Sequence, residues 1–267
     1  MIEPRFGDLE VLTRFPAGEP RPAPVLFIHG AYTGAWCWEP YFLPYFAEAG
    51  YASYAVSLRG HGRSKGRSIL DSTGIADYVA DVASVVSRLP AEPVLVGHSM
   101  GGMVVQKYLE QANARAVVLM ASVPPQGLWA SAIGLAFKKP GLLGDLNRLL
   151  GGGKVPLDTL REALFFEPVP LERLKHYYEG MQAESHRAIW DMTLFNLPHI
   201  TRMHRPPMLV LGAEHDHLVP ASMVEMTGRG YGVEAEVFAG MGHGMMLERS
   251  WRKVAGRIGQ WLAAEGI

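Results

Sequence analysis

Residues 93–101 read Pro-Val-Leu-Val-Gly-His-Ser-Met-Gly, and they carry the strongest structural signal in the chain. Its apolar run, Val94–Val96, is typical of a buried strand, and apolar residues after it keep helical spacing: Met103, Val104, Tyr108 and Leu109. The stretch therefore predicts a strand, one sharp turn and a helix, with Ser99 at the tip of the turn. Gly97 and Gly101 suit that turn, because bulkier residues would clash with the strand and helix that it joins.

A serine hydroxyl is a weak nucleophile unless a histidine and a carboxylate activate it. Asp216 comes a few residues after the apolar run Leu209–Leu211, and His243 lies in a glycine-flanked loop before the last helical pattern. Loops that follow parallel strands meet at one edge of a sheet, so we expect these residues to converge. The sequence therefore predicts Ser99 as nucleophile, His243 as its base and Asp216 as the acid that orients His243.

Other polar residues near these motifs compete for the same roles. Glu214 stands two residues before Asp216 and is the competing acid, although the spacing from the strand favours Asp216. The run 215–217 (His-Asp-His) permits a metal site, but adjacent side chains of an extended loop diverge and no third ligand cluster is in view. We expect no metal, and we expect His98 to pack beside the elbow and His61 to serve the structure of its own loop.

Acyl transfer also needs hydrogen-bond donors for the negatively charged oxygen of the intermediate. The backbone N–H of Met100 directly follows Ser99 and opens a helix, which favours negative charge. The loop after the first apolar strand candidate, His29-Gly30-Ala31-Tyr32, offers the N–H of Ala31 as the second donor. We expect the aromatic side chains of Tyr32, Trp36 and Trp38 to wall the pocket.

Composition narrows the class of protein. The chain has 267 residues, enough for one large core with an insert, and a net charge of −1 gives no electrostatic reason to expect nucleic acid. Cys37 is the only cysteine, so an internal disulfide or a cysteine-based metal cluster is excluded. No apolar run approaches the roughly 18 residues that span a bilayer, and the first residues do not resemble a signal peptide. We therefore expect a cytoplasmic protein without nucleic-acid or membrane partners.

Short apolar runs alternate with helical patterns along most of the chain, which indicates a parallel sheet covered on both faces. Strands are predicted at 25–28, 52–58, 94–96, 116–120, 208–211 and 234–238, and helices at 75–89 and 251–262. The alternation fails between 123 and 198, where helices are predicted at 171–181 and 184–195. We therefore predict a core of residues 1–122 and 199–267 and a helical cap of residues 123–198, which would lie over the carboxyl ends of the strands.

Four separated motifs together resemble the α/β-hydrolase superfamily, and specifically its capped serine hydrolases of the carboxylesterase and lipase type. They are His29-Gly30, the elbow Gly97–Gly101, Gly212–Asp216 and Gly242-His243. The order serine, aspartate, histidine is the one described for that fold. The resemblance implies an α/β fold with a mostly parallel central sheet flanked by helices and a helical cap between strands. It implies a triad of Ser99, Asp216 and His243, an oxyanion hole from Ala31 and Met100, and no cofactor.

The activity that the resemblance implies is hydrolysis of a small to medium hydrophobic carboxylic ester through an acyl-enzyme. Haloalkane dehalogenases and soluble epoxide hydrolases of the superfamily carry aspartate where this chain has Ser99. Carbon–carbon bond hydrolases commonly have an aromatic residue after the catalytic histidine, where this chain has Gly244. Carbon–carbon hydrolysis, a perhydrolase or haloperoxidase activity on the same triad, and a small-molecule receptor without turnover all remain open at this point.

Overall fold

The computed structural model describes residues 6–151 and 153–267. A seven-stranded sheet forms its centre, with the strand order β1-β3-β2-β4-β5-β6-β7. The strands are β1 (Val11–Arg14), β2 (Val25–Ile28), β3 (Ser53–Val56), β4 (Val94–His98), β5 (Ala116–Met120), β6 (Met208–Ala213) and β7 (Ala235–Phe238). Strand β1 pairs antiparallel with β3, and every other neighbouring pair is parallel. The α/β fold with a mostly parallel sheet, expected from the sequence, is confirmed.

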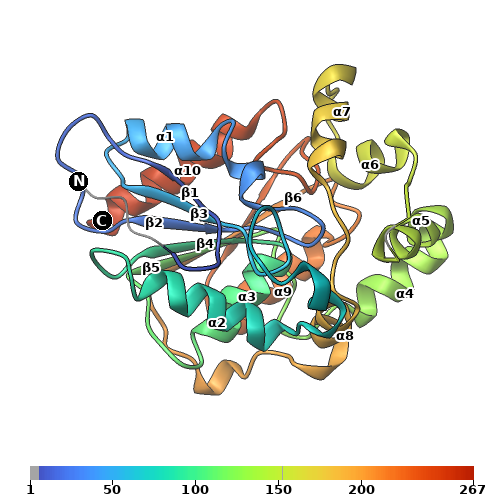
Figure 1. Ribbon diagram of the computed structural model, residues 1–267, viewed down its shortest axis with the longest axis horizontal. Coiled ribbons are helices and arrows are strands. Elements are labelled where there is room, and N and C mark those ends of the chain that lie inside the picture. The colour runs from blue at the N-terminus through green and yellow to red at the C-terminus, as the bar shows by residue number, and fades with distance from the viewer. Residues whose placement is uncertain (1–5, 152) are drawn as a thin grey trace.

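Helices cover both faces of the sheet (Figure 1). Helices α1 (Phe42–Glu48) and α10 (Trp251–Ala264) pack on one face, and α2 (Ile75–Val86), α3 (Met100–Tyr108) and α9 (Ala221–Tyr231) pack on the other. Side chains alternate along each strand, so Val25 and Phe27 of β2 enter the first core and Leu26 and Ile28 the second. Each such side chain contributes about 1.5–3 kcal/mol when it is fully buried.

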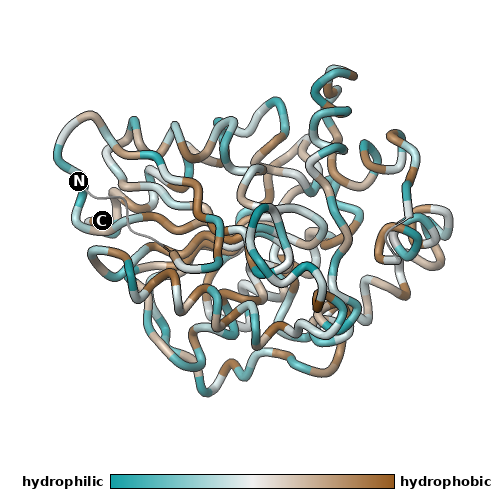
Figure 2. Tube along the Cα trace, viewed as in Figure 1, coloured by the Kyte–Doolittle hydropathy of each residue, from teal (hydrophilic) through white to brown (hydrophobic). Residues whose placement is uncertain are grey.

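The central strands are buried on both sides and form the most hydrophobic part of the chain trace (Figure 2). The six strands predicted from apolar runs correspond to β2–β7, with ends that differ by a few residues. Strand β1 escaped prediction because four partly exposed residues at a sheet edge are too few to show a period of two. The positions of β4, β6 and β7 matter most for function, because the loops after them carry the predicted triad.

Between β5 and β6 the described residues form helices and no strand. These helices are α4 (Trp129–Lys138), α5 (Pro140–Leu150), α6 (Leu157–Leu164), α7 (Leu171–Gly180) and α8 (His186–Trp190), with a π-helical turn at Asp191–Phe195. Helices α4–α7 lie at one end of the molecule, past the end of the sheet that carries Ser99, while the C-terminus lies at the opposite end (Figure 1). The boundaries 123 and 198 of a separate cap remain a prediction.

Helix length and polarity bear on any membrane association. Within residues 6–151 and 153–267, no helix combines the length and the apolar character needed to cross a bilayer. The cytoplasmic location inferred from the sequence stays a prediction.

Candidate active site

Ser99 occupies a strained turn between β4 and α3. Its backbone has φ +53° and ψ −118°, a left-handed conformation that L-residues rarely adopt. A Cβ atom at Gly97 would come within 2.5 Å of the Gly101 carbonyl oxygen, and one at Gly101 would overlap backbone oxygens of Ile28 and His29. The two glycines predicted to allow the elbow are therefore required by direct backbone contacts on both sides of it.

The other two predicted triad residues meet directly. Nδ1 of His243 lies 2.7 Å from Oδ2 of Asp216, and both side chains are buried. The second carboxylate oxygen of Asp216 accepts the backbone N–H groups of Leu218 and Val219, each at 2.8 Å. Because its own loop fixes Asp216, the carboxylate holds the proton of His243 on Nδ1. Nε2 then lies on the edge of the ring that points away from Asp216.

His98 joins the elbow to the histidine loop. Its Nε2 donates a hydrogen bond to the carbonyl oxygen of His243 at 2.9 Å, and the centroids of the two imidazole rings lie 4.6 Å apart. Burial, followed by the nearby His243, lowers the pKa of His98 well below its ordinary value. A neutral His98 therefore serves as a spacer that brings the loop of His243 against the turn of Ser99.

The competing residues of the sequence point away from this arrangement. Glu214 is half-exposed and accepts the N–H of Gly240 at 2.8 Å instead of contacting His243. The ring of His215 stacks on Phe166 with a centroid distance of 3.7 Å. In the part of the chain that the structure describes, no three or more His, Cys, Asp or Glu residues gather as metal ligands would.

The predicted oxyanion donors lie on both sides of Ser99. Met100 opens helix α3, and neither its N–H nor that of Ala31 donates to any other described residue. A Cβ atom added to Gly30 would lie 3.0 Å from the Cβ of Ser99, so the loop of Ala31 packs directly on the elbow. Both N–H groups therefore adjoin the turn of Ser99, and their use as oxyanion donors stays a prediction.

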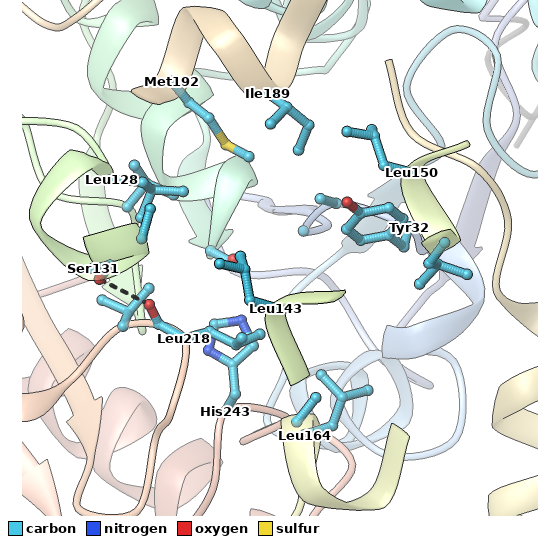
Figure 3. A pocket seen from close by; sticks show the side chains of 18 of the residues that line it. Tyr32, Leu128, Ser131, Leu143, Leu150, Leu164, Ile189, Met192, Leu218 and His243 are labelled. Carbon is cyan, nitrogen blue, oxygen red and sulfur yellow. Dashed lines mark hydrogen bonds between the residues drawn. The ribbon is translucent and has the colours of Figure 1, made fainter. Parts of the chain in front are cut away.

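A cavity of about 360 Å³ opens in front of these groups. Ser99, His243, Ala31 and Tyr32 all line it, and the insert supplies most of the rest. The lining is dominated by apolar side chains, among them Leu128, Leu143, Leu150, Leu164, Ile189, Met192 and Leu218 (Figure 3). Asp145 is the single carboxylate among the described lining residues, and Thr159 donates to it at 2.6 Å. Such a cavity suits an uncharged, mainly apolar small molecule.

Two of the predicted pocket aromatics lie elsewhere. Trp36 is absent from the described cavity lining and stacks on Tyr177 of α7, with ring centroids 6.1 Å apart. Trp38 is fully buried beneath the sheet, where its ring packs against Phe27 and Phe42. Both residues belong to a short 3-10 helix, Ala35–Trp38, that turns away from the cavity after Tyr32. Of the three aromatics, only Tyr32 lines it.

Two buried glutamates escaped the sequence analysis. Glu184, between α7 and α8, and Glu248, just before α10, are both fully buried and accept hydrogen bonds from residues far away in the sequence. Neither lies in a recognisable motif. The chain has 26 acidic residues, and nothing in the sequence distinguishes these two from the others. Their partners come from elements whose relative positions only the folded insert defines.

Glu248 ties the loop of His243 to the insert. Its Oε1 accepts the N–H of Phe166 at 2.7 Å and that of Gly242 at 2.9 Å. The N–H of Gly244 adds a hydrogen bond of 2.6 Å to the carbonyl oxygen of Leu164. The segment after α6 and the loop that carries His243 are therefore held together on both sides of the histidine.

Burial raises the pKa of Glu248 despite those two N–H donors, and its Oε2 has no hydrogen-bond partner among the described residues. A raised folded-state pKa means that the protonated form stabilises the fold, and that this stability is lost as pH rises above about 4.5. Glu248→Gln removes the titration and keeps the acceptor. We expect the melting temperature of the variant, relative to the unmodified protein, to increase between pH 4.5 and pH 8. Thermal unfolding across that range, with Glu214→Gln as an exposed control, measures it, and a difference that does not change with pH contradicts it.

Comparison with known proteins agrees with this architecture. A family model described as "Alpha/beta hydrolase family" matches residues 25–257. An esterase from Exiguobacterium antarcticum superposes with a TM-score of 0.73 at 20% identity, covering 96% of this chain and 95% of that one. At that identity the likeness shows the fold alone.

Curated relatives match over shorter stretches. Epoxide hydrolase A of Mycobacterium tuberculosis is 30% identical over 179 residues, 58% of this chain and 55% of that protein. A bifunctional esterase/perhydrolase of Acinetobacter calcoaceticus is 38% identical over 112 residues, 40% of this chain and 39% of that protein. The chain thus matches between a third and just over half of the length of the first curated relatives. Because the family model covers most of the sequence, the chain belongs to the alpha/beta hydrolase family.

Proposed function

We propose that this protein is a serine hydrolase that cleaves small to medium hydrophobic carboxylic esters through an acyl-enzyme. The observation that carries the proposal is the buried hydrogen bond between Asp216 and His243 on the wall of an apolar cavity that Ser99 also lines. The family alone does not decide the chemistry, because one fold serves many reactions. The residues of the site support acyl transfer, because a serine, a histidine and a carboxylate are the groups that this chemistry requires.

The proposed reaction has two halves. Oγ of Ser99 forms a bond to the ester carbonyl carbon as its proton passes to Nε2 of His243, and the carbonyl oxygen becomes an oxyanion held by the N–H groups of Met100 and Ala31. The bond to the alcohol oxygen then breaks, and that oxygen takes the proton from His243. Water repeats the sequence on the acyl-enzyme and releases the acid. Asp216 keeps the Nδ1 proton in place and stabilises the imidazolium in both halves.

The lining of the cavity supports the proposed substrate class. Leucine, isoleucine, valine and methionine side chains surround the space in front of Ser99, and Asp145 supplies the one carboxylate of the described lining. An ester whose free end carries a negative charge would lose hydration without gaining a partner and would face Asp145. We therefore expect uncharged acyl groups to react fastest, and a volume of about 360 Å³ limits their length.

Covalent labelling combined with turnover tests the proposal. A fluorophosphonate should attach to Ser99, identified by mass spectrometry of the modified peptide, and p-nitrophenyl esters of increasing acyl length should be hydrolysed with an optimum at short to medium chains. A receptor without turnover would bind esters and release no acid. Adding hydrogen peroxide or a carbon–carbon substrate in parallel measures the two competing activities, and a rate above that of ester hydrolysis would replace the proposal.

The cavity wall offers a direct test of chain-length selection. Ile189 of α8 projects into the cavity (Figure 3), so Ile189→Trp should shorten the space for the acyl chain. We expect kcat/KM for an octanoate ester to fall roughly tenfold relative to an acetate ester, because a pocket discriminates by the space it leaves. Ile133→Trp, at an exposed isoleucine of α4 outside the cavity lining, is the matched control. An equal loss for both esters contradicts the assignment of this wall.

A further inference from the structure

A buried carboxylate from the insert lies beneath the loop that carries the proposed oxyanion donor. Glu184 is fully buried and accepts four hydrogen bonds. Its Oε1 accepts from the hydroxyl of Tyr78 at 2.6 Å and the N–H of Ser185 at 2.7 Å. Its Oε2 accepts from Nε2 of His61 at 3.0 Å and the N–H of Tyr32 at 3.3 Å. One side chain thus binds the insert, the loop of His61 and the loop of Tyr32 together.

The partner of this carboxylate is a buried histidine. Both ring nitrogens of His61 face acceptors, because Nδ1 lies 3.1 Å from the carbonyl oxygen of Arg59 while Nε2 faces Glu184. Both contacts are hydrogen bonds only when both nitrogens carry protons. Burial alone would raise the pKa of Glu184, but the charge of His61 and the converging hydrogen bonds lower it below its ordinary value. A hydrogen-bonded His61–Glu184 pair therefore lies in the interior of the protein.

A second histidine beside the pair is held neutral. The ring of His29 lies 5.0 Å from that of His61, and burial followed by the charge of His61 lowers the pKa of His29 to about 3. Nε2 of His29 accepts the N–H of Leu58 at 3.0 Å, so Nδ1 carries the proton and donates to the carbonyl oxygen of Gly30 at 2.8 Å. The carbonyl immediately before Ala31 is thereby fixed.

The residue after Ala31 is fixed from the opposite side. Tyr32 has φ +65°, a left-handed conformation that is strained for a tyrosine. Its N–H donates to Glu184, and its carbonyl oxygen accepts the N–H of Gln182 at 3.0 Å. The segment 182–184 thus holds both polar backbone groups of Tyr32, while the N–H of Ala31 donates to no other described residue.

We propose that Glu184, paired with His61, is a positioning residue that holds the Tyr32 backbone in its strained turn and so aims the Ala31 N–H at the oxyanion. This inference rests on the proposed function, because it needs an acyl-transfer reaction in which that oxyanion forms. Glu184 acts only through the loop and is outside the described cavity lining. It also makes the catalytic geometry depend on the docked insert, since α8 begins one residue after Ser185, whose hydroxyl accepts the N–H of Ala188.

Glu184→Gln tests the proposal. An amide oxygen cannot serve four donors, and its NH₂ group would face donors on one side. We expect kcat for a p-nitrophenyl ester to fall roughly 10- to 100-fold with little change in KM, because a misaligned oxyanion donor weakens the transition state more than the ground state.

The inhibition constant of a trifluoromethyl ketone with the same acyl chain gives a second measurement. A merely structural role of Glu184 would leave this constant unchanged. Oγ of Ser99 adds to the carbonyl carbon of the ketone, the proton passes to His243, and the oxygen becomes an oxyanion in the hole. Its inhibition constant should rise in Glu184→Gln by about the factor by which kcat/KM falls. The corresponding secondary alcohol forms no adduct, and its inhibition constant should stay the same.

Asp81→Asn is the matched control. Asp81 is a buried carboxylate that also anchors the loop of residues 59–61, through Arg59, and it contacts none of residues 29–33. We expect it to lower the melting temperature and leave kcat within about twofold. His61→Gln provides a second variant if Glu184→Gln does not fold, and it should lower kcat in the same way. The double variant should lose no more than Glu184→Gln alone, because paired residues are not additive.

The outcomes separate the two proposals. An unmodified protein that neither hydrolyses esters nor reacts with a fluorophosphonate overturns the proposed function and this inference together. An active protein in which Glu184→Gln or His61→Gln behaves like Asp81→Asn overturns the positioning role alone. A loss that appears in KM and in binding of the secondary alcohol would assign Glu184 to the shape of the cavity and also reject the proposal.

Discussion

Ser99→Ala should lower kcat/KM for a p-nitrophenyl ester by at least about 10⁴-fold, because no covalent acyl-enzyme can form without the hydroxyl. The elbow backbone stays available to alanine, since Ala121 in the same structure also has a positive φ, of 42°. Thermal unfolding should therefore show a folded variant. Steady-state hydrolysis and fluorophosphonate labelling measure the effect.

Ser131 supplies the control for that prediction. It lines the same cavity, but its hydroxyl donates to the carbonyl oxygen of Leu218 at 3.0 Å and contacts neither His243 nor Asp216. Ser131→Ala should keep kcat/KM within a few-fold of the original. Most of the activity surviving in Ser99→Ala, or an equal loss in both variants, would remove Ser99 from the role of nucleophile.

Asp216→Asn should lower kcat by about 10⁴-fold while the fold persists. The amide can present its NH₂ group to Nδ1 of His243, which favours the tautomer with the proton on Nε2. That proton would face Ser99, and the base would have no lone pair to receive the serine proton. Hydrolysis rates measured over a range of pH report the loss.

Glu214→Gln is the companion variant, because Glu214 is the carboxylate nearest in sequence and lies outside the hydrogen bond to His243. Its rate should stay within about threefold of the original. If Glu214→Gln were the damaging change and Asp216→Asn the mild one, the acid of the site would have to be reassigned.

Residues next to strands were the most predictable part of this molecule. Ser99, Asp216 and His243 each follow an apolar strand, and parallel strands deliver their carboxyl ends to one edge, so sequence order alone suggested that they meet. The elbow was predictable because glycine spacing reports steric crowding that the structure bears out at Gly97 and Gly101. The contact between Asp216 and His243 could be predicted once the two preceding strands, β6 and β7, were placed side by side.

What escaped prediction depends on the insert. The sequence predicts Trp36 in the cavity, but a 3-10 helix redirects the chain two residues after Tyr32. Glu184 carries no local signal, since its role exists only where Tyr78, His61 and Tyr32 converge on it. The edge strand β1 was not predicted for a different reason. Its four partly exposed residues are too few to show the alternation of apolar and polar side chains that marks a strand.

The hydrogen bonds that join residues 164–166 to the loop of His243 have a consequence for substrate entry. Any outward movement of the chain after α6 would break these hydrogen bonds and displace His243, so we expect this corner to stay fixed when the cavity opens. Helices α4 and α5 share no hydrogen bond with that loop among the described residues, and α5 is joined to α6 through Asp145 and Thr159. Amide hydrogen exchange should therefore be slow at Phe166 and Gly244 and markedly faster along α4 and α5, and ester should enter from their side.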